Sequence, residues 1–382
     1  ASYREVNAFM GRALMRFNKP DATFWIHDYH FLSLALELRR LGVTQPIGFF
    51  LHTPFPSRAV AVGLPHHQEL VRAMLSYDLI GFQTDGDLAN FADYVRRELG
   101  LSVVDGTVRS PHGQVRLASF PIGIDVSAFA DRATKSVQRA EVARLRASLQ
   151  GAKLVIGVDR VDYSKGLVNR LTAFDRMLEA EPHLKRAVSM LQIAVPSRCQ
   201  IDTYRRLQRD LSSLVGEING RHGEVDWIPI RYLAKGFSQA ALAGFYRVAR
   251  VGLVTSLHDG MNLVAKEYVA AQDGANPGVL VLSEFAGAAR QLDAALLVNP
   301  HDIDGLARTV AQALAMPIGE RRERWTAMMA KLEGYQLDTW FSNFVEALGG
   351  RRTIPRVAVV ADRTLVPFRS RRTEILPAAQ LH

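Results

Sequence analysis

Short apolar runs rich in β-branched residues alternate along this chain with longer stretches of helical periodicity, and this alternation constrains the fold more than any other feature. Strands that alternate with amphipathic helices form a parallel sheet flanked by helices. The chain is therefore predicted to be an α/β protein with two consecutive doubly wound units. The predicted strands are 23–26, 47–51, 79–82 and 115–120 in a first series, and 154–158, 189–195, 227–230, 251–255, 279–282 and 295–298 in a second.

The two series are separated by residues 121–125, which contain a proline and a glycine and are predicted to be the crossing between the units. We expect four parts. They are an N-terminal unit at 1–125, a second unit at 126–334, a C-terminal helix at 335–350 and a tail at 351–382. In doubly wound units the ligand crevice lies at the carboxyl ends of the strands, so functional residues are expected just after strands.

The formal net charge of +9 raises the question of a nucleic-acid partner. Residues 351–382 hold seven arginines against two acidic residues, so more than half of the excess lies in the tail. That segment has three prolines and little periodicity, and it is predicted to be a loosely ordered extension. Because no nucleic-acid-binding motif accompanies the charge, we expect no nucleic-acid partner.

The single cysteine, Cys199, excludes an internal disulfide framework and a thiol cluster for structural zinc. Its simplest interpretation is a small buried hydrophobic residue. No apolar run approaches the roughly 18 residues of a membrane span, and no signal segment opens the chain. We therefore predict a soluble cytoplasmic protein without a membrane partner.

Two histidine-containing loops follow predicted strands of the first unit. Asp28 is expected either to accept hydrogen bonds from sugar hydroxyls or to cap a helix. His52, before two prolines, is expected to donate to a sugar hydroxyl or to be satisfied by backbone carbonyls. His27 and His30 have the spacing of metal ligands, but no HExxH context or cysteine supports a metal site. Asp85-Gly86-Asp87 formally matches a DxD element, yet its place at a helix start favours capping.

The most basic loop follows the first strand of the second unit. Arg160 and Lys165 lie five residues apart there, and together they suit a diphosphate that gains charge as a leaving group. The alternative is two surface cations paired with Asp159 and Asp162. Arg198, after the next strand, is a third candidate contact for an anion or else an ordinary surface arginine.

Residues 259–267 join a later strand to a helix in the second unit. Gly260 permits a close approach of the backbone, and free N–H groups at a helix start favour phosphate oxygens. Glu267 lies more than a turn inside this helix, where its carboxylate can accept from both hydroxyls of a ribose. The alternative for Glu267 is a solvated side chain paired with Lys266 or Arg290.

Seven strings in this order resemble the trehalose-6-phosphate synthases, and the resemblance extends over about residues 2–348. They are WIHDYH, IGFFLHTPFP, YDLIGFQT, FPIGID, RVDYSKG, SLHDGMNLVAKEYVAAQ and GVLVLSEFAGAA. The resemblance implies a GT-B fold, in which two Rossmann-like domains face a cleft and the second holds the donor. It implies transfer of glucose, with retention, from UDP-glucose to glucose 6-phosphate, which forms trehalose 6-phosphate and UDP in trehalose biosynthesis and osmoprotection.

No metal and no other cofactor is implied by the resemblance, and the expected partners are the two small-molecule substrates. Self-association into a homo-oligomer is left open. One alternative is a related synthase with another phosphorylated acceptor. Another is a non-catalytic remnant that binds nucleotide.

The resemblance also implies roles for individual residues. Arg160 and Lys165 match the diphosphate ligands, Glu267 the ribose ligand, and Phe237 the residue beside the uracil. The implied donor-binding set is Arg160, Lys165, Phe237, Leu263, Val264, Ala265, Lys266 and Glu267. The implied catalytic set is Arg160, Lys165, Asp259, His52 and Asp28, with Asp259 and His52 on the transferred glucose. Asp28 and Arg198 belong to the acceptor side, and Thr53 lies near the anomeric carbon, where some members carry a larger apolar residue.

Family members carry a first strand and a glycine-rich loop, about a hundred residues in all, before the point that corresponds to Ala1. We therefore expect the N-terminal domain to be incomplete and the chain as given to bind nucleotide with little synthase activity. The favoured mechanism for the family is a front-face substitution without a covalent glycosyl-enzyme. A double displacement through Asp259 or Asp28 is the alternative.

Overall fold

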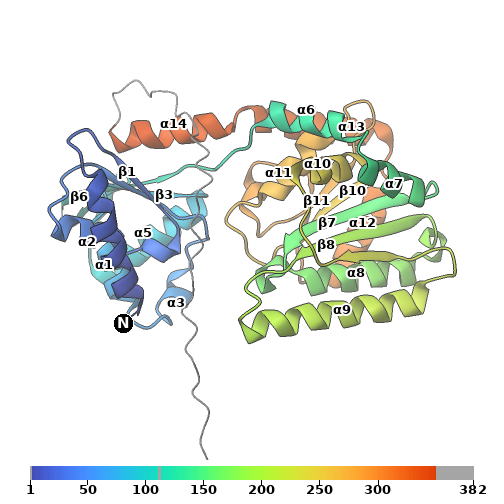
Figure 1. Ribbon diagram of the computed structural model, residues 1–382, viewed down its shortest axis with the longest axis horizontal. Coiled ribbons are helices and arrows are strands. Elements are labelled where there is room, and N and C mark those ends of the chain that lie inside the picture. Colours follow the sequence, from blue (N-terminus) through green and yellow to red (C-terminus); the bar gives the residue numbers. More distant parts are fainter. Residues whose placement is uncertain (1, 111–112, 350–382) are drawn as a thin grey trace, which may run out of the picture. The chain divides into compact units, whose positions relative to one another are not determined.

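The computed structural model describes residues 2–110 and 113–349, and these contain two six-stranded sheets with helices packed against them (Figure 1). The predicted α/β class is confirmed. The segment 351–382, predicted to be a loosely ordered tail, lies outside the described residues. Among the described residues, no helix combines the length and the apolar character that crossing a bilayer requires.

The first sheet has the strand order β1-β2-β3-β6-β5-β4, and its first four strands run parallel. Its strands are β1 (Phe24–His27), β2 (Ile47–Phe50), β3 (Leu79–Phe82), β4 (Val103–Val104), β5 (Thr107–Ser110) and β6 (Gly113–Ser119). The accompanying helices are α1 (Ser2–Leu14), α2 (Leu34–Arg40), α3 (Arg58–Ala61), α4 (His67–Met74) and α5 (Asp85–Leu99).

The hairpin of β4 and β5 makes the far end of this sheet antiparallel, which the sequence analysis did not predict. Asp105 and Gly106 form its two-residue turn, and both have positive φ angles of 47° and 68°. An Asp-Gly pair is the usual signal for such a turn. The hairpin was missed because two- and four-residue strands are too short to show a hydrophobic period.

The second sheet is parallel throughout, with the order β12-β11-β10-β7-β8-β9. This order reverses direction between β7 and β10, so the carboxyl ends of these two strands form the switch point at which doubly wound sheets bind ligands. Its strands are β7 (Lys153–Arg160), β8 (Val188–Val195), β9 (Ile230–Leu233), β10 (Val251–Val254), β11 (Val279–Ser283) and β12 (Leu296–Val298).

One strand prediction in this sheet was wrong in position, because β9 begins at Ile230 and not at Trp227. Trp227 lies in a tight turn, where its backbone bridges to Glu224. Its buried indole N–H donates to the carbonyl oxygen of Val188, 3.1 Å away. The apolar run at 227–230 therefore reflects burial of this turn, and only its last residue belongs to the strand.

Helices cover both faces of the second sheet (Figure 1). On one face the core lies under α8 (Leu167–Ala180), α9 (Asp202–His222) and α12 (Ile303–Ala315). On the other it lies under α6 (Val126–Ser136), α7 (Ala140–Ser148), α10 (Gln239–Val248), α11 (Leu263–Ala271) and α13 (Ile318–Glu333). Because both faces are covered, its strands are continuous apolar runs, which made them visible in the sequence.

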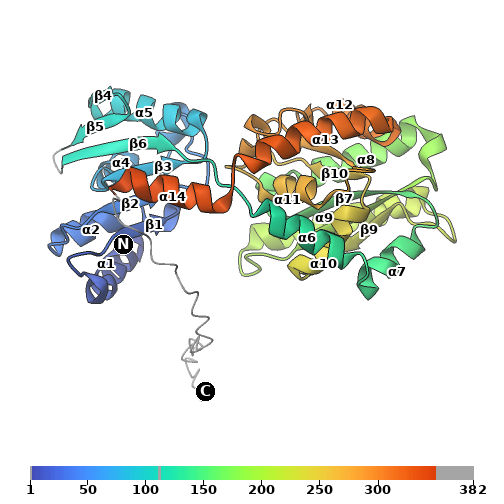
Figure 2. The ribbon, with the colours of Figure 1, turned by 90° about the horizontal axis from the view of Figure 1, so that it is seen from above.

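The last described helix, α14 (Leu337–Leu348), returns to the first sheet and lies across its strands (Figure 2). Phe344 is fully buried and packs with Phe50 and Leu79. Gly48 and Gly81 make room for its ring, since a methyl group at either position would lie less than 3 Å from ring atoms. Glycine is required in these two strands because the helix approaches their backbone closely.

Two connecting segments run side by side between the sheets. Ile124 pairs with Gln336 in a parallel bridge, and a methyl group at Gly123 would lie 1.8 Å from the carbonyl oxygen of Tyr335. The carbonyl of Ile122 accepts a hydrogen bond of 2.5 Å from the ammonium of Lys266 in α11. The predicted crossing at 121–125 is thus fixed to the return segment and to a helix of the second sheet.

Candidate active site

The loop after β7 places two cations at the switch point. Arg160, the last residue of β7, is exposed, and its side chain has no hydrogen bond or ion pair within the part of the chain that the structure describes. Asp162 caps the short turn that carries Lys165 by accepting from a backbone N–H two residues on, at 3.0 Å. Gly166 follows with φ of 62°, and a methyl group there would lie 2.1 Å from the carbonyl oxygen of Thr255. The loop is therefore held against the end of β10.

Lys165 and Asp259 form an ion pair of 2.6 Å between the loops after β7 and β10. Their side chains are 16% and 14% exposed, so the pair is mostly shielded from water. The same carboxylate oxygen, Oδ2, accepts from Asn262 Nδ2 at 2.9 Å and Ser256 Oγ at 3.2 Å. Three donors thus hold Asp259 in one orientation, and this fixed anion positions Lys165 at the switch point between β7 and β10.

The alternative interpretation of this loop, in which Arg160 and Lys165 pair with Asp159 and Asp162, is wrong. Asp159 instead makes a buried ion pair of 2.7 Å with Arg170, whose side chain has no exposure. Burial raises the pKa of Asp159, which Arg170 opposes. Asp159 is therefore a structural residue beneath the loop, and the two cations remain at the crevice.

The start of α11 presents free backbone donors. Asn262 adopts a positive φ of 80° and caps the helix by accepting from the N–H of Ala265 at 3.0 Å. The N–H groups of Leu263 and Val264, in the first turn, have no intrahelical partner. Leu263 is exposed and Val264 half-buried, whereas Ala265 is fully buried. This turn can accept an anion or a nucleotide edge.

Glu267 and Lys266 are neighbours in α11 with opposite environments. Burial raises the pKa of Glu267 to about 7, against the lowering influence of Gln239 and Arg132. Lys266 is fully buried, its ammonium donates to the carbonyl of Ile122, and burial lowers its pKa to about 7. The suggested pairing of Glu267 with Lys266 is therefore wrong. Glu267 is a carboxylate that is shielded from water and has a raised pKa, and groups of this kind are common in binding and catalytic sites.

Phe237 precedes α10, the helix beside α11. Its half-buried ring meets Phe245 edge-on with centroids 5.4 Å apart, and the ammonium of Lys235 lies 5.3 Å from its centroid. Gln239, two residues on, is a neighbour of Glu267. The structure thus brings Phe237 and the carboxylate of Glu267 to the same pair of helices.

His27, at the end of β1, and His52, just after β2, form a half-buried pair. His27 Nδ1 lies 3.0 Å from His52 Nε2, and Gln83 Nε2 lies 3.4 Å from His52 Nδ1. Burial lowers the pKa of both rings, that of His27 to about 4 with a contribution from His52. The carbonyl oxygen of His52 touches Gly260, where a methyl group would lie only 2.1 Å from it. Gly260 therefore brings the loop of Asp259 against the loop of His52.

Asp28 is not a helix cap, so that interpretation is wrong. Its side chain makes no capping hydrogen bond, and its φ of 69° places it in a region that favours glycine. Its Oδ1 atom is buried and has no hydrogen-bond partner among the described residues. A strained backbone and an unsatisfied carboxylate oxygen are both typical of a ligand site.

Arg198 joins the loop after β8 to the loop after β1. Its guanidinium donates to Tyr204 Oη at 2.5 Å and to Tyr29 Oη at 2.8 Å. Tyr29 directly follows Asp28, so Arg198 and Asp28 lie on neighbouring parts of the fold. Cys199, interpreted as a buried hydrophobic residue, is exposed, and that interpretation is wrong. It lies in a turn after the strand has ended, where no core is available.

Two remaining candidates lie in loops of the first sheet. Thr53 is exposed beside His52. Asp87 is buried, accepts from the N–H of Phe55 at 3.0 Å and exchanges hydrogen bonds with the capping residue Thr84. The DxD element is therefore structural, and it holds the loop that carries His52.

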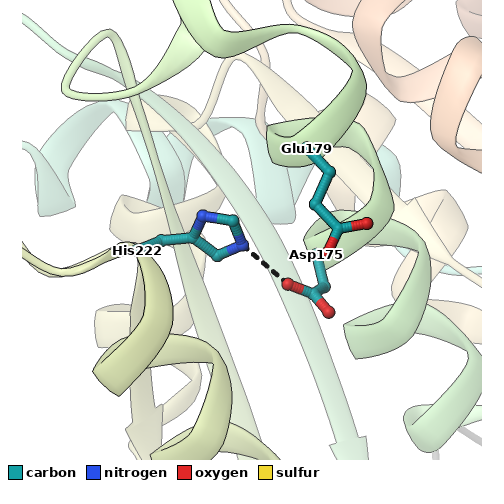
Figure 3. A group of neighbouring side chains, drawn as sticks. All are labelled: Asp175, Glu179 and His222. Carbon is teal, nitrogen blue, oxygen red and sulfur yellow. Dashed lines mark hydrogen bonds and ion pairs between the residues drawn. The ribbon is translucent and has the colours of Figure 1, made fainter.

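One cluster of metal-ligand type lies between α8 and α9, in Asp175, Glu179 and His222 (Figure 3). His222 Nε2 lies 2.7 Å from Asp175 Oδ1. Arg221 Nη1 lies 2.7 Å from Asp175 and 3.2 Å from Glu179, so a guanidinium already balances both carboxylates. The cluster is a connection between two helices and does not include any candidate site residue.

Sequence reasoning missed four residues that position the site. Tyr29, Gln83, Asn262 and Arg170 contact Arg198, His52, Asp259 and Asp159 respectively. Gln83 directly follows β3, and Tyr29 lies in the loop after β1. Their position just after a strand was the signal that could have identified them. Arg170 and Asn262 lie in or at helices, where a polar residue has no distinctive pattern.

These features define a class. Two mainly parallel sheets with helices packed against them carry a pair of cations suited to a diphosphate, a shielded carboxylate on a helix and a carboxylate with an unsatisfied oxygen. This is the arrangement of a GT-B glycosyltransferase. The model of glycosyltransferase family 20 matches residues 1–349. The chain belongs to this family.

Several relatives are similar over most of the chain. A curated trehalose-6-phosphate synthase from Sinorhizobium fredii is 47% identical over 91% of this chain and 75% of its own length. A solved α,α-trehalose-phosphate synthase (UDP-forming) from Burkholderia xenovorans, in complex with glucose 6-phosphate, is 46% identical with a TM-score of 0.90 and covers 91% of this chain and 78% of that one. An Escherichia coli structure described as bound with UDP-2-fluoro glucose is 39% identical with a TM-score of 0.89 and covers 93% and 78%.

Proposed function

We propose that this chain transfers glucose, with retention of configuration, from UDP-glucose to glucose 6-phosphate and releases trehalose 6-phosphate and UDP. Family membership supports the reaction, together with the names of relatives that form UDP or are complexed with glucose 6-phosphate. The observation that carries the proposal is the pair of cations, Arg160 and Lys165, at the switch point of the second sheet.

The leaving group is UDP in this proposal, and its diphosphate gains negative charge as the glycosidic bond breaks. Arg160 has an exposed, unpaired guanidinium within the described residues, which leaves its donors available to phosphate oxygens. Lys165 supplies a second charge from a fixed position. Charges that are already in place stabilise a developing anion without reorganisation, and this effect is typically the largest in such reactions.

The nucleotide half of the donor lies on α10 and α11 in this proposal. Glu267 accepts from the ribose hydroxyls, Phe237 lies beside the uracil, and residues 263–266 line the site. Lys266 contributes through its backbone, because its ammonium is committed to Ile122. His52 and Asp259 hold the transferred glucose from opposite loops that meet at Gly260.

The acceptor side consists of Asp28 and Arg198. The free Oδ1 of Asp28 accepts from a hydroxyl of glucose 6-phosphate, and Arg198 offers its charge to the phosphate. Thr53, exposed next to His52, lies near the anomeric carbon.

The front-face substitution is favoured over a double displacement through Asp259. The Oδ2 atom of Asp259 is occupied by Lys165, Asn262 and Ser256, and a carboxylate with three donors is a weak nucleophile. We therefore assign Asp259 to hydrogen bonding with the sugar. Positioning of the acceptor hydroxyl about 3 to 3.5 Å from the anomeric carbon supplies the remainder of the acceleration.

No metal ion is required in this proposal. Arg160 and Lys165 neutralise the diphosphate charge, as Mg²⁺ does in other enzymes. The DxD element is not available to a metal, because Asp87 accepts from the backbone of the loop that carries His52. Dialysis against EDTA is expected to leave turnover unchanged, and a loss that Mg²⁺ restores would contradict this part.

The experiment is an assay of the full gene product that contains this chain, with UDP-glucose and glucose 6-phosphate. Release of UDP and formation of an α,α-linked product, identified by proton NMR, are expected. A preference for another phosphorylated acceptor, such as glycerol 3-phosphate, would show that glucose 6-phosphate is not the acceptor. UDP binding without turnover on any acceptor would indicate a non-catalytic nucleotide-binding protein.

We also propose a cytoplasmic location. The exposed Cys199 is a free thiol, and a reducing compartment keeps such a thiol unmodified. Cell fractionation that finds the protein in another compartment would contradict this.

A further inference from the structure

Gln83 lies just after β3 and is almost fully buried, at 2% exposure. Its side chain reaches two partners. The oxygen Oε1 accepts from the backbone N–H of Ile122 at 3.0 Å, and the nitrogen Nε2 lies 3.4 Å from His52 Nδ1. The same Ile122 peptide is held at its carbonyl by Lys266. Gln83 therefore stands between the crossing segment and the histidine pair.

The orientation of the Gln83 amide follows from its partners. A backbone N–H can only donate, so the amide oxygen must face Ile122 and the amide NH₂ must face His52. A donor at His52 Nδ1 requires a lone pair on that nitrogen. In a neutral imidazole the proton then lies on Nε2, and His52 donates from Nε2 to His27 Nδ1 at 3.0 Å.

Both rings are held neutral. A neutral imidazole has one donor nitrogen and one acceptor nitrogen, so the direction of each hydrogen bond is defined. Burial lowers the pKa of His27 and His52, and Asp28 is the charged group that opposes the shift on each ring. The other rings that contact His52 are the uncharged side chains of Phe50 and Trp340. A protonated His52 would place two N–H donors against Gln83 and His27 together, which the Gln83 amide disfavours.

We propose that Gln83 is a positioning residue that fixes His52 as its Nε2–H tautomer, so that His52 presents a hydrogen-bond donor to the sugar. The consequence for catalysis rests on the proposed function. His27 accepts the proton of Nε2 when no sugar is present, and a hydroxyl oxygen of the transferred glucose takes its place on binding. The opposite tautomer would present a lone pair at that position and lose this bond.

The discriminating variant is Gln83→Glu, which keeps the size of the side chain and the acceptor for Ile122 while replacing the donor with a carboxylate. A carboxylate accepts from His52 Nδ1–H, so the proton moves to Nδ1 or the ring becomes doubly protonated. The measurement is ¹⁵N NMR of protein labelled at histidine, with His52 assigned by its loss in His52→Asn. In the unmodified protein we expect a protonated Nε2 and an unprotonated Nδ1.

Gln272→Glu is the matched control. Gln272 is a buried glutamine whose Nε2 donates to the backbone carbonyls of Tyr246 and Tyr268, and whose Oε1 accepts from the N–H of Gly278, so it has no histidine partner. This variant should leave the His52 nitrogen shifts unchanged. Gln83→Glu should move them, and should lower kcat/KM by about 10-fold near neutral pH, the equivalent of one hydrogen bond.

The pH profile separates a positioning role from a purely structural one. In Gln83→Glu the added carboxylate raises the pKa of His52, so kcat/KM should gain a second dependence on pH between about 6 and 8, in addition to the one that Glu267 gives the unmodified protein. A protonated Nδ1 on His52 in the unmodified protein would overturn the proposal without any variant. Unchanged His52 shifts in a folded Gln83→Glu protein would overturn it as well. If no acceptor supports turnover, the proposed function fails, and the NMR measurement still decides the tautomer.

Discussion

We expect Glu267, the proposed ribose ligand, to make the binding of UDP-glucose dependent on pH. Burial raises the pKa of this carboxyl to about 7, and only the ionised form accepts from both ribose hydroxyls. The apparent dissociation constant should therefore rise as protons compete with the ligand. It should be about 11-fold above its limiting value at pH 6, and close to that limit at pH 8.

Isothermal titration calorimetry with UDP-glucose tests this, because the diphosphate of that ligand does not titrate near neutral pH. At pH 6, in buffers of different ionisation enthalpy, binding should release about 0.9 proton. Glu267→Gln is the control and should give a flat profile with no proton release. Lys266→Met should keep the slope, although the pKa of Lys266 is also about 7. A flat profile in the unmodified protein, or the same slope in Glu267→Gln, would refute the reasoning.

The same shift affects stability with a defined sign. The folded pKa of Glu267 lies above its usual value of 4.5, so the folded state binds more protons than the unfolded chain between these values. The contribution of this group to stability is therefore complete below about pH 4.5 and is lost as the pH rises to about 7. Above about pH 7 the folded protein therefore holds an ionised Glu267 at a cost in stability, and bound UDP-glucose is expected to reduce that cost.

Three further predictions follow from single contacts. Arg160→Ala should lower kcat about 10²- to 10³-fold without a change in Tm, because its guanidinium has no partner within the described residues; a normal kcat would remove Arg160 from the site. Gly260→Ala should destabilise the protein by about 1–3 kcal/mol in urea unfolding, since the added methyl meets the backbone of His52, and unchanged stability would mean that the two loops separate freely. Phe344→Ala should lower the free energy of unfolding by about 3–5 kcal/mol, with Asn343→Ala, at an exposed position, as control. Equal effects of the two variants would show that α14 does not pack as described.

Most of the parallel strands could be predicted closely because a strand buried on both faces, such as β2, β3, β8 or β10, is a continuous apolar run in the sequence. The places of the candidate site loops could be predicted for the same reason, since these loops begin where the apolar runs end. Arg160 is the last residue of β7, and Asp259 lies in the loop after β10. The hairpin of β4 and β5 was not found, because strands of two and four residues are too short for an alternating pattern to stand out in the sequence.

The partners of the site residues could not be predicted. Lys165 and Asp259 are 94 residues apart, and their meeting depends on β10 lying next to β7. Lys266 and Glu267 are adjacent in the sequence, yet a helical step of about 100° sends one into the core and the other toward the site. The positive φ of Asp28 likewise depends on the loop around it and leaves no trace in the residue type.

The return of α14 to the first sheet sets an order on how the protein can fold as it is made. The face with Phe50 and Leu79 packs against Phe344, and residue 337 is synthesised about 220 residues after β6 ends. At roughly 5–20 residues per second, this apolar face waits about 10 to 45 s on the ribosome for its helix. The first sheet therefore keeps this apolar face exposed while the whole second sheet is being translated. During this interval the nascent chain depends most on a chaperone that covers exposed apolar surface.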